Sequence, residues 1–289
     1  MLNLELLVVG IASLILVSAD VHAVEKVDSD IASGNTSEFW VNYVQDENDA
    51  QNYSLGLNIG LGLDDSLLVS AGQSESELLG EAIETNSFLL GYSHFGTAPW
   101  TTNAFYEYWG KRRELVIESV GIGVNYFATD WNAGIEFEYR DIDFFTRELM
   151  AGQRRYTVNS MGIGFNTGLS SGQLTWSLNG MWYDYSENIQ RLNTARGIFI
   201  LGLKNFYHVS SLNEWTTATG LYYRFNSSRL GLNYSYGVAK LDGAASSTVS
   251  LLFDVELTDE VAVETELGRS FAEQDVTTDY VLVGFGFHF

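Results

Sequence analysis

The chain ends in VLVGFGFHF, from Val281 to Phe289, and this stretch decides the class of fold. Large apolar side chains fill every second position up to the last residue, and two glycines lie between them. Such alternation is typical of a β-strand with one apolar face. At the edge of a soluble sheet, a polar tail would usually follow the strand. We therefore favour the other explanation, a strand that closes a barrel whose outer face contacts lipid.

Period-two alternation recurs through most of the chain after residue 36, and the helical period is absent. It is plain in Tyr53–Leu63, in Val116–Phe127 and in Leu230–Val238. In each segment one face is apolar, and the other carries glycine, serine and asparagine. A soluble β-sandwich would instead carry residues such as lysine, glutamate and threonine on its polar face. The pattern predicts an all-β fold, a transmembrane antiparallel up-and-down β-barrel with a small, polar interior.

The connections between the strand-like segments are of two kinds. Short turns are expected at Asp64-Asp65, Gly96–Pro99, Ala128–Asp130, Ser170–Gly172, Asn226–Ser228 and Thr258–Glu260. Longer or more polar connections are expected at Asp46–Gln51, Ser74–Glu84, Thr146–Arg154, Glu187–Arg196, Leu241–Ser246 and Ala272–Thr277. Transmembrane barrels have short turns on the periplasmic rim and longer loops on the outer rim. Aromatic residues near the ends of the segments agree with the girdles that such barrels place at both membrane interfaces.

The last strand also carries a motif. Gly284, Phe287 and Phe289 have the spacing of a glycine, two residues, an apolar residue, one residue and a terminal aromatic residue. Leu282 stands where a polar residue is usual. The stretch resembles the C-terminal β-signal of Gram-negative outer-membrane β-barrel proteins, which the barrel-assembly machinery recognises during insertion. The resemblance implies a porin-like protein of the cell outer membrane, in contact with outer-membrane lipids and lipopolysaccharide, and it specifies no single family.

The first residues predict an export signal. Leu6–Val17 reads LLVVGIASLILV, which has the length of the apolar region of a signal peptide and is too short for a membrane-spanning helix. Val21-His22-Ala23 supplies a small-residue cleavage pattern, although the preceding MLNLE carries Glu5 and no base. We expect residues 1–23 to be a signal peptide, residues 24–36 a short periplasmic lead-in, and residues 37–289 the barrel.

Composition excludes several classes of function. The net charge of −22 argues against nucleic-acid binding, which depends on Lys and Arg at phosphates. The absence of cysteine excludes disulfides and thiolate metal sites. No metal-ligand spacing and no phosphate-binding loop is found, so the sequence predicts neither a metal nor a cofactor.

The number of strands depends on one segment. Outside it, fourteen strand-like segments follow one another from Glu38 to Phe289, and a chain that returns to the periplasm needs an even number. If Gly197–Phe206 and Tyr207–Leu212 form a further hairpin, the barrel has 16 strands. If the whole stretch Glu187–Glu214 is a loop, it has 14. The apolar run IFILGL favours 16, because it would be unusual in a solvated loop.

Since the apolar face of each strand points outward, the alternation along the strand identifies the charged residues that point into the barrel. Counting from the Thr258–Glu260 turn places Asp254 opposite Glu264, and like charges across a ladder favour a solvated surface. The expected pore-lining residues are Glu136, Glu138, Arg140, Arg224, Asp254, Glu256, Glu264 and Glu266.

This excess of acids predicts a channel for passive diffusion of small hydrophilic solutes that prefers cations. An unselective, water-filled wall explains the same charges about equally well. An export conduit or a structural barrel, for example a polysaccharide exit port, is the alternative function.

An enzymatic interpretation rests on His208-Val209-Ser210, which resembles the His-x-Ser spacing of outer-membrane lipid hydrolases. Those families need a third residue, Asn or Glu, about a dozen positions on, to orient the imidazole. The corresponding position here is near Tyr222, which cannot serve in the usual way. We therefore predict no catalytic residue and no enzymatic activity.

Overall fold

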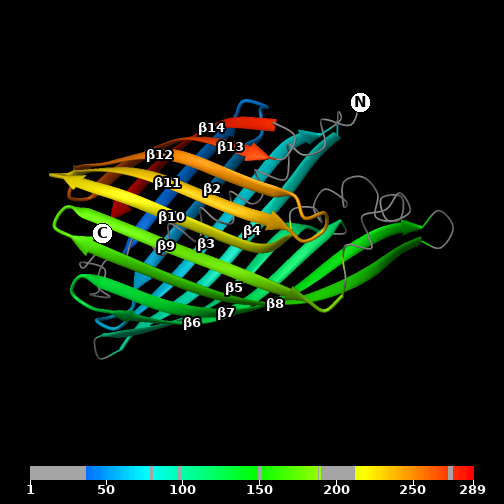
Figure 1. The fold of residues 1–289 in the computed structure, drawn as a ribbon, viewed down its shortest axis with the longest axis horizontal. Helices are drawn as coiled ribbons and strands as arrows, with labels where there is room; N and C mark the ends of the chain where they lie inside the picture. Colours follow the sequence, from blue (N-terminus) through cyan, green and yellow to red (C-terminus); the bar gives the residue numbers. More distant parts are fainter. Residues whose placement is uncertain are drawn as a thin grey trace.

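The computed structural model describes residues 37–78, 81–96, 99–112, 114–148, 152–187, 189, 212–272 and 276–289. These residues form fourteen antiparallel strands in a closed barrel (Figure 1). Each strand pairs with its neighbours in the sequence, and β14 pairs with β1 to close the wall. None of the described residues belongs to a helix long and apolar enough to cross a membrane. The expected signal peptide and lead-in lie outside the described residues.

The strands run from 9 to 20 residues in length. Their bounds are β1 Glu38–Asp46, β2 Gln51–Gly60, β3 Asp65–Leu78, β4 Glu81–Phe95, β5 Trp100–Lys111, β6 Leu115–Phe127, β7 Trp131–Glu148, β8 Gly152–Ser171, β9 Leu174–Tyr185, β10 Asn213–Phe225, β11 Ser228–Ala239, β12 Ala245–Thr258, β13 Val261–Ala272 and β14 Val276–His288.

The preference for 16 strands was wrong, and the alternative of 14 is correct. The segment that was expected to add a hairpin, Gly197–Leu212, lies outside the described residues except for Leu212. However, β9 pairs directly with β10, from Trp182 opposite Trp215 to Leu174 opposite Tyr223. A closed barrel has no free edge at which another hairpin could join the wall, so the wall is complete without that segment.

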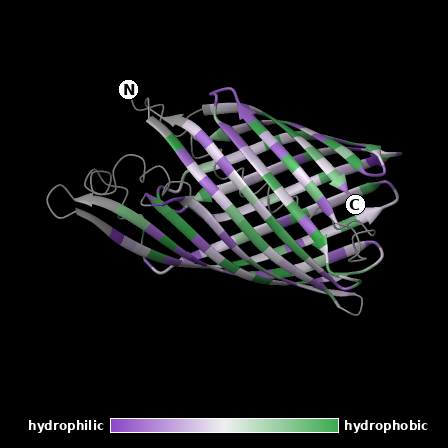
Figure 2. Ribbon diagram, turned by 180° about the vertical axis from the view of Figure 1, so that it is seen from behind, coloured by the Kyte–Doolittle hydropathy of each residue, from purple (hydrophilic) through white to green (hydrophobic). Residues whose placement is uncertain are grey.

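The two faces of the wall follow the predicted parity. Apolar side chains are exposed on the outside, among them Ile122 at 62% and Leu55 at 53%. Figure 2 shows the result as hydrophobic and hydrophilic residues that alternate along the strands. An exposed apolar surface that encircles a closed barrel is what a lipid-facing wall requires.

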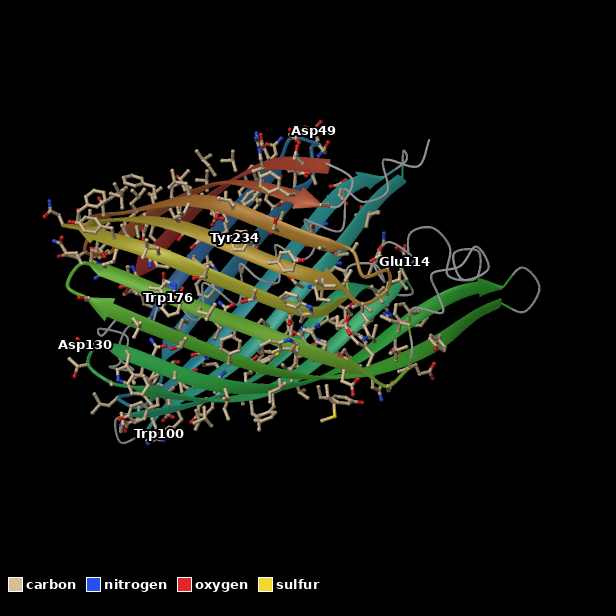
Figure 3. The ribbon with its side chains drawn as sticks, in the orientation of Figure 1. Asp49, Trp100, Glu114, Asp130, Trp176 and Tyr234 are labelled. Carbon is tan, nitrogen blue, oxygen red and sulfur yellow. The ribbon has the colours of Figure 1, made fainter. Side chains whose placement is uncertain are left out.

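The aromatic residues gather at both ends of this surface. At the rim with the short turns, the rings of Trp100 and Tyr126 lie 4.9 Å apart. Toward the other rim, the ring centroids of Tyr43 and Tyr53 lie 5.0 Å apart, and those of Trp215 and Tyr236 lie 5.2 Å apart. Figure 3 shows Trp100 at the short-turn end of the barrel. The two groups agree with the girdles expected at the membrane interfaces.

The first and last strands form the seam of the barrel. Ser37 and Phe289 exchange two backbone hydrogen bonds, of 3.1 and 2.9 Å, and Phe39 lies opposite Phe287. The residues of the predicted assembly motif therefore lie in β14 and directly after it, beside β1 at the short-turn rim. That the barrel-assembly machinery reads them stays a prediction.

The turns on one rim match the prediction, whereas the other rim differs from it. Two segments expected as long connections are largely strand, because β3 continues to Leu78 and β4 begins at Glu81, while β7 continues to Glu148 and β8 begins at Gly152. Figure 1 shows the β7–β8 hairpin projecting past the ends of the other strands. Part of the inner wall is therefore extended beyond the barrel rim.

Candidate functional site in the lumen

The register places all eight predicted pore-lining residues on the inner face. In β7, for example, Phe137 and Tyr139 are exposed on the outside, whereas Glu138 and Arg140, which alternate with them, are buried, at 5% and 9%. Asp254 lies opposite Glu264, as counted from the turn. The register thus gives the direction of these side chains, and their role as pore-lining residues stays a prediction.

Glu138 and Arg140 form a buried ion pair on the inner wall. Arg140 donates from Nε to Glu138 Oε1 over 2.6 Å and from Nη2 to Oε2 over 3.1 Å. The hydroxyl of Tyr183 on β9 donates to Glu138 Oε2 over 3.0 Å, and the guanidinium carbon of Arg140 lies 3.8 Å from the Tyr183 ring centre. The two charges neutralise each other, so Glu138 adds little to the field in the lumen.

A second set of charges lies near the short-turn rim. The paired positions run Arg224, Arg229, Asp254 and Glu264 across β10 to β13, so two bases precede two acids along one row. Arg229 Nη2 donates to Asp254 Oδ2 over 3.2 Å. Sequence analysis missed Arg229, although it shares the parity of the inner-facing Gly231. The acidic cluster is therefore partly balanced by a base on the adjacent strand.

The other predicted acids differ in their surroundings. Glu266 is 7% exposed and accepts a 2.5 Å hydrogen bond from the hydroxyl of Tyr280. Glu136 and Glu264 are half-buried, whereas Glu256 is exposed next to the turn that joins β12 to β13. Glu256 is therefore the member of the set best placed to act on ions in solution.

Several inward glycines lie under aromatic rings, which explains why the wall needs glycine there. A Cβ added to Gly121 would lie 2.2 Å from the Phe105 ring, and one added to Gly162 would lie 2.8 Å from the Tyr183 ring. The same relation holds for Trp40 over Gly56, Tyr222 over Gly231 and Tyr280 over Gly268. At these positions the glycines make room for rings that cover the backbone, and they leave no open space in the lumen.

An apolar cluster covers the inner wall near the long-loop rim. Its members are buried and come from β5 to β9, from the connection between β9 and β10, and from the turn after β11: Trp109, Leu115, Ile117, Ile142, Phe144, Val158, Tyr183, Tyr185, Ile189, Leu212 and Leu241. Leu115, Ile142 and Phe144 are 0% exposed. Since a barrel interior is usually polar, this cluster is a departure that sequence analysis missed. One arc of the outer mouth is therefore lined by apolar side chains.

On the remaining strands, the inner face carries smaller and more polar side chains. On β12, β13 and β14 it carries Thr248, Ser250, Ser270 and Thr278, and Thr248 lies 3.0 Å from Ser270 through their hydroxyl oxygens. On β2 to β4 it carries Asn52, Ser66 and Thr85. The polar side of the lumen is therefore the arc from β12 through β14 and β1 to β4.

The described residues include no group of three or more His, Cys, Asp or Glu side chains arranged to hold a metal ion. His208 and Ser210, which carried the hydrolase interpretation, lie outside the described residues.

Solved structures share this architecture. The CymD monoaromatic hydrocarbon channel matches with a TM-score of 0.52 at 9% identity, over 88% of this chain and 87% of that one. The fold is that of an outer-membrane β-barrel. A loop-deletion mutant of OmpT, an outer-membrane protein of Vibrio cholerae, matches with a TM-score of 0.49 at 8% identity, over 88% of this chain and 98% of that one. The NanC porin matches with a TM-score of 0.46 at 9% identity, over 86% and 98% of the two chains.

The barrel fold that the chain shares with CymD agrees with its exposed apolar surface and with the expected place in the cell outer membrane. No protein-family profile matches the chain. No curated protein matches its sequence.

Proposed function

We propose that this outer-membrane barrel is a non-enzymatic channel for the passive diffusion of small hydrophilic solutes, with a preference for cations. The observation that carries the proposal is the inner face of the described strands, on which carboxylates outnumber bases. The inward acids include Glu38, Asp46, Glu107, Glu136, Glu138, Asp254, Glu256, Glu264 and Glu266, against Arg140, Arg224, Arg229 and, at the rim, Lys111.

The ion pairs limit the strength of this preference. Glu138 is neutralised by Arg140, and Asp254 contacts Arg229, so both contribute less than isolated carboxylates would. Glu256 is exposed at the short-turn mouth, where a charge acts on ions over about a Debye length, roughly 10 Å at 0.1 M salt. A modest cation preference, set mainly at the periplasmic mouth, follows from this distribution.

Swelling of proteoliposomes tests the diffusion part of the proposal. Vesicles that contain the refolded barrel are diluted into isotonic solutions of neutral sugars of increasing size. We expect swelling with the smallest solutes and a steep fall with size, while empty vesicles stay unchanged. If vesicles with heat-modifiable, correctly folded barrel swell no faster than empty ones, the diffusion channel is excluded.

The apolar cluster supports a second candidate, a channel for small apolar or aromatic solutes. Trp109, Phe144 and Tyr183 belong to a continuous apolar surface inside the outer mouth, which a channel for hydrophilic solutes alone does not need. CymD, whose fold is similar, is a monoaromatic hydrocarbon channel. Vesicles that enclose an aromatic-responsive dye distinguish the two candidates, because only the second predicts that the barrel accelerates entry of a monoaromatic compound such as toluene.

A further inference from the structure

The inner wall near the short-turn rim separates bases from acids. Arg224 on β10 lies opposite Arg229 on β11, and Asp254 on β12 lies opposite Glu264 on β13. Arg229 is in turn opposite Asp254, so the four residues form one row with both bases at one end. Adjacent strands lie about 4.8 Å apart, and the row therefore spans roughly 14 Å of the wall. The row is thus an electric dipole that lies across the strands.

The middle of this row is held by contacts on both sides. Arg229 Nη2 donates to Asp254 Oδ2 over 3.2 Å, and the guanidinium carbon of Arg229 lies 5.5 Å from the centre of the Tyr222 ring. The hydroxyl of Tyr222 donates in turn to Asn233 Oδ1. The ion pair has the same direction as the whole row and adds to its dipole. A dipole that is fixed in advance acts on a solute without first having to reorient.

The ends of the row are accessible from the periplasmic mouth. Arg224 is exposed next to the turn between β10 and β11, and Glu264 is half-buried. Glu256 lies two residues beyond Asp254 on the same inner face and is exposed. Charges at this mouth act over about a Debye length, roughly 10 Å at 0.1 M salt. A small solute above the middle of the row is therefore within range of the bases and of the acids at the same time.

The adjacent strands do not cancel this separation of charge. On the basic side, the inner face of β9 carries Thr175 and Ser177 toward this rim. On the acidic side, β14 carries Gly284 and Gly286, and Glu38 on β1 is a further acid. The basic end of the row is therefore flanked by uncharged side chains, and the acidic end is flanked by glycine and by another carboxylate.

We propose that this row selects zwitterionic solutes, which are small molecules with both a carboxylate and an ammonium group, such as amino acids. The solute carboxylate points toward Arg224 and Arg229, and its ammonium group points toward Glu264. An uncharged solute of the same size gains nothing from the field, and a singly charged ion is attracted at one end of the row and repelled at the other. The proposal rests on the diffusion channel proposed above and gives that channel a substrate class.

Swelling of proteoliposomes with three isomeric solutes tests the proposal. Lactamide, alanine and β-alanine have the same molecular formula, but lactamide is uncharged, and β-alanine separates its two charges farther than alanine does. Swelling is measured at neutral pH and low salt, and the rate of empty vesicles is subtracted. We expect the wild type to admit alanine at least about twofold faster than lactamide, and β-alanine faster still.

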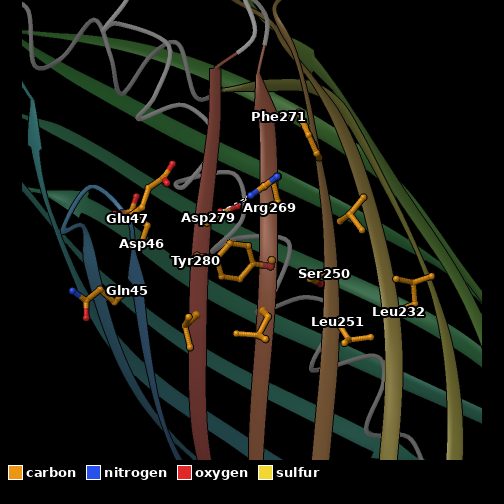
Figure 4. Close-up of a pocket in the computed structure, with 14 residues that line it drawn as sticks. Gln45, Asp46, Glu47, Leu232, Ser250, Leu251, Arg269, Phe271, Asp279 and Tyr280 are labelled. Atoms are coloured by element: carbon orange, nitrogen blue, oxygen red, sulfur yellow. Dashed lines mark hydrogen bonds and ion pairs between the residues drawn. The ribbon is translucent and has the colours of Figure 1, made fainter.

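Arg224→Gln/Glu264→Gln removes one base and one acid, so it weakens the dipole and leaves the net charge of the lumen unchanged. In this variant the isomers should enter at nearly equal rates. The matched control is Arg269→Gln/Asp279→Asn, which also removes one base and one acid. Arg269 Nε donates to Asp279 Oδ1 over 2.5 Å in an exposed ion pair on the outer surface, between β13 and β14 (Figure 4). The control should keep the preference of the wild type.

The outcomes separate this proposal from the channel on which it rests. A preference for alanine that is lost in Arg224→Gln/Glu264→Gln and kept in Arg269→Gln/Asp279→Asn, with heat-modifiable mobility in both variants, supports the proposal. Equal entry of alanine and lactamide in the wild type would overturn it and leave the diffusion channel standing. A preference that survives in Arg224→Gln/Glu264→Gln, or one that is lost equally in the control, would also overturn it. A folded barrel that admits none of the three solutes would overturn both.

Discussion

Removal of one partner from the buried ion pair on β7 should destabilise the barrel far more than removal of both. In Glu138→Gln the carboxylate charge is lost, while Arg140 stays buried, with its side chain 11% exposed. An uncompensated buried charge of this kind costs about 3–5 kcal/mol. The double variant Glu138→Gln/Arg140→Met leaves no charge behind, so its free energy of unfolding should return close to that of the wild type, since a buried pair and a well-packed apolar replacement are often nearly equal in stability.

The assay is reversible urea unfolding in lipid vesicles, followed by tryptophan fluorescence and by gel mobility. The matched control is Asp279→Asn, which breaks the exposed Arg269–Asp279 pair and should have a much smaller effect, because solvent screens both groups. A loss in Glu138→Gln no larger than that in Asp279→Asn would refute the reasoning. So would a double variant whose loss equals the sum of the losses in Glu138→Gln and in Arg140→Met alone, because that would show that Glu138 and Arg140 are not coupled.

Three further outcomes follow from the structure. Ile122→Arg places a charge on the lipid-facing surface and should lower the free energy of unfolding by about 2–4 kcal/mol, as measured in vesicles; unchanged stability would mean that Ile122 does not face lipid. Deletion of Phe289 should lower the amount of barrel in the outer membrane, and normal abundance on an immunoblot would show that the residue is no assembly signal. Gly121→Val should clash with the Phe105 ring and reduce the yield of folded barrel, and Phe105→Ala in the same chain should restore it.

Parity was the most reliable part of the sequence analysis. The alternation of Ile122 and Gly121, or of Phe253 and Asp254, assigned faces that the structure confirms, since a one-residue slip would turn every apolar side chain inward. The short turns were equally clear, because their residues have specific backbone preferences. Asn226, for example, has a φ of 57°, in the left-handed region that asparagine tolerates.

The number of strands could not be read in the same way. IFILGL has the composition of a strand, and periodicity cannot tell whether such a segment joins the wall. That depends on a long-range choice, whether β9 pairs with its own hairpin partner or with β10, and the structure shows that it pairs with β10.

The apolar cluster was missed for a physical reason. Where β7 leaves the membrane, the outside becomes aqueous, and the polarity of the two faces is exchanged. Asp141 and Asp143 face outward there, while Ile142 and Phe144 face inward on the same side as Arg140. Period-two alternation is the same on both sides of this boundary, so periodicity alone does not detect the exchange. The sequence does carry a signal, because the outward-facing positions change from aromatic at Tyr139 to acidic at Asp141.

The sequence therefore predicted which way the charged side chains point, but not which of them contact one another. Parity gives the face of Glu138 and Asp254, but their partners sit two residues along the strand or on an adjacent strand, and only the rotamers and the register bring them together.

The most direct test of a cation-preferring channel is the reversal potential of the barrel in a planar bilayer under a gradient of potassium chloride. The wild type should insert in discrete conductance steps and reverse on the cation-selective side, more strongly at low salt. Glu256→Gln/Glu264→Gln should shift the reversal potential toward zero, while Glu118→Gln, which removes one carboxylate from the outer surface, should leave it unchanged. A folded barrel that conducts no ions, or one that prefers anions, would contradict the channel and favour an export or structural role.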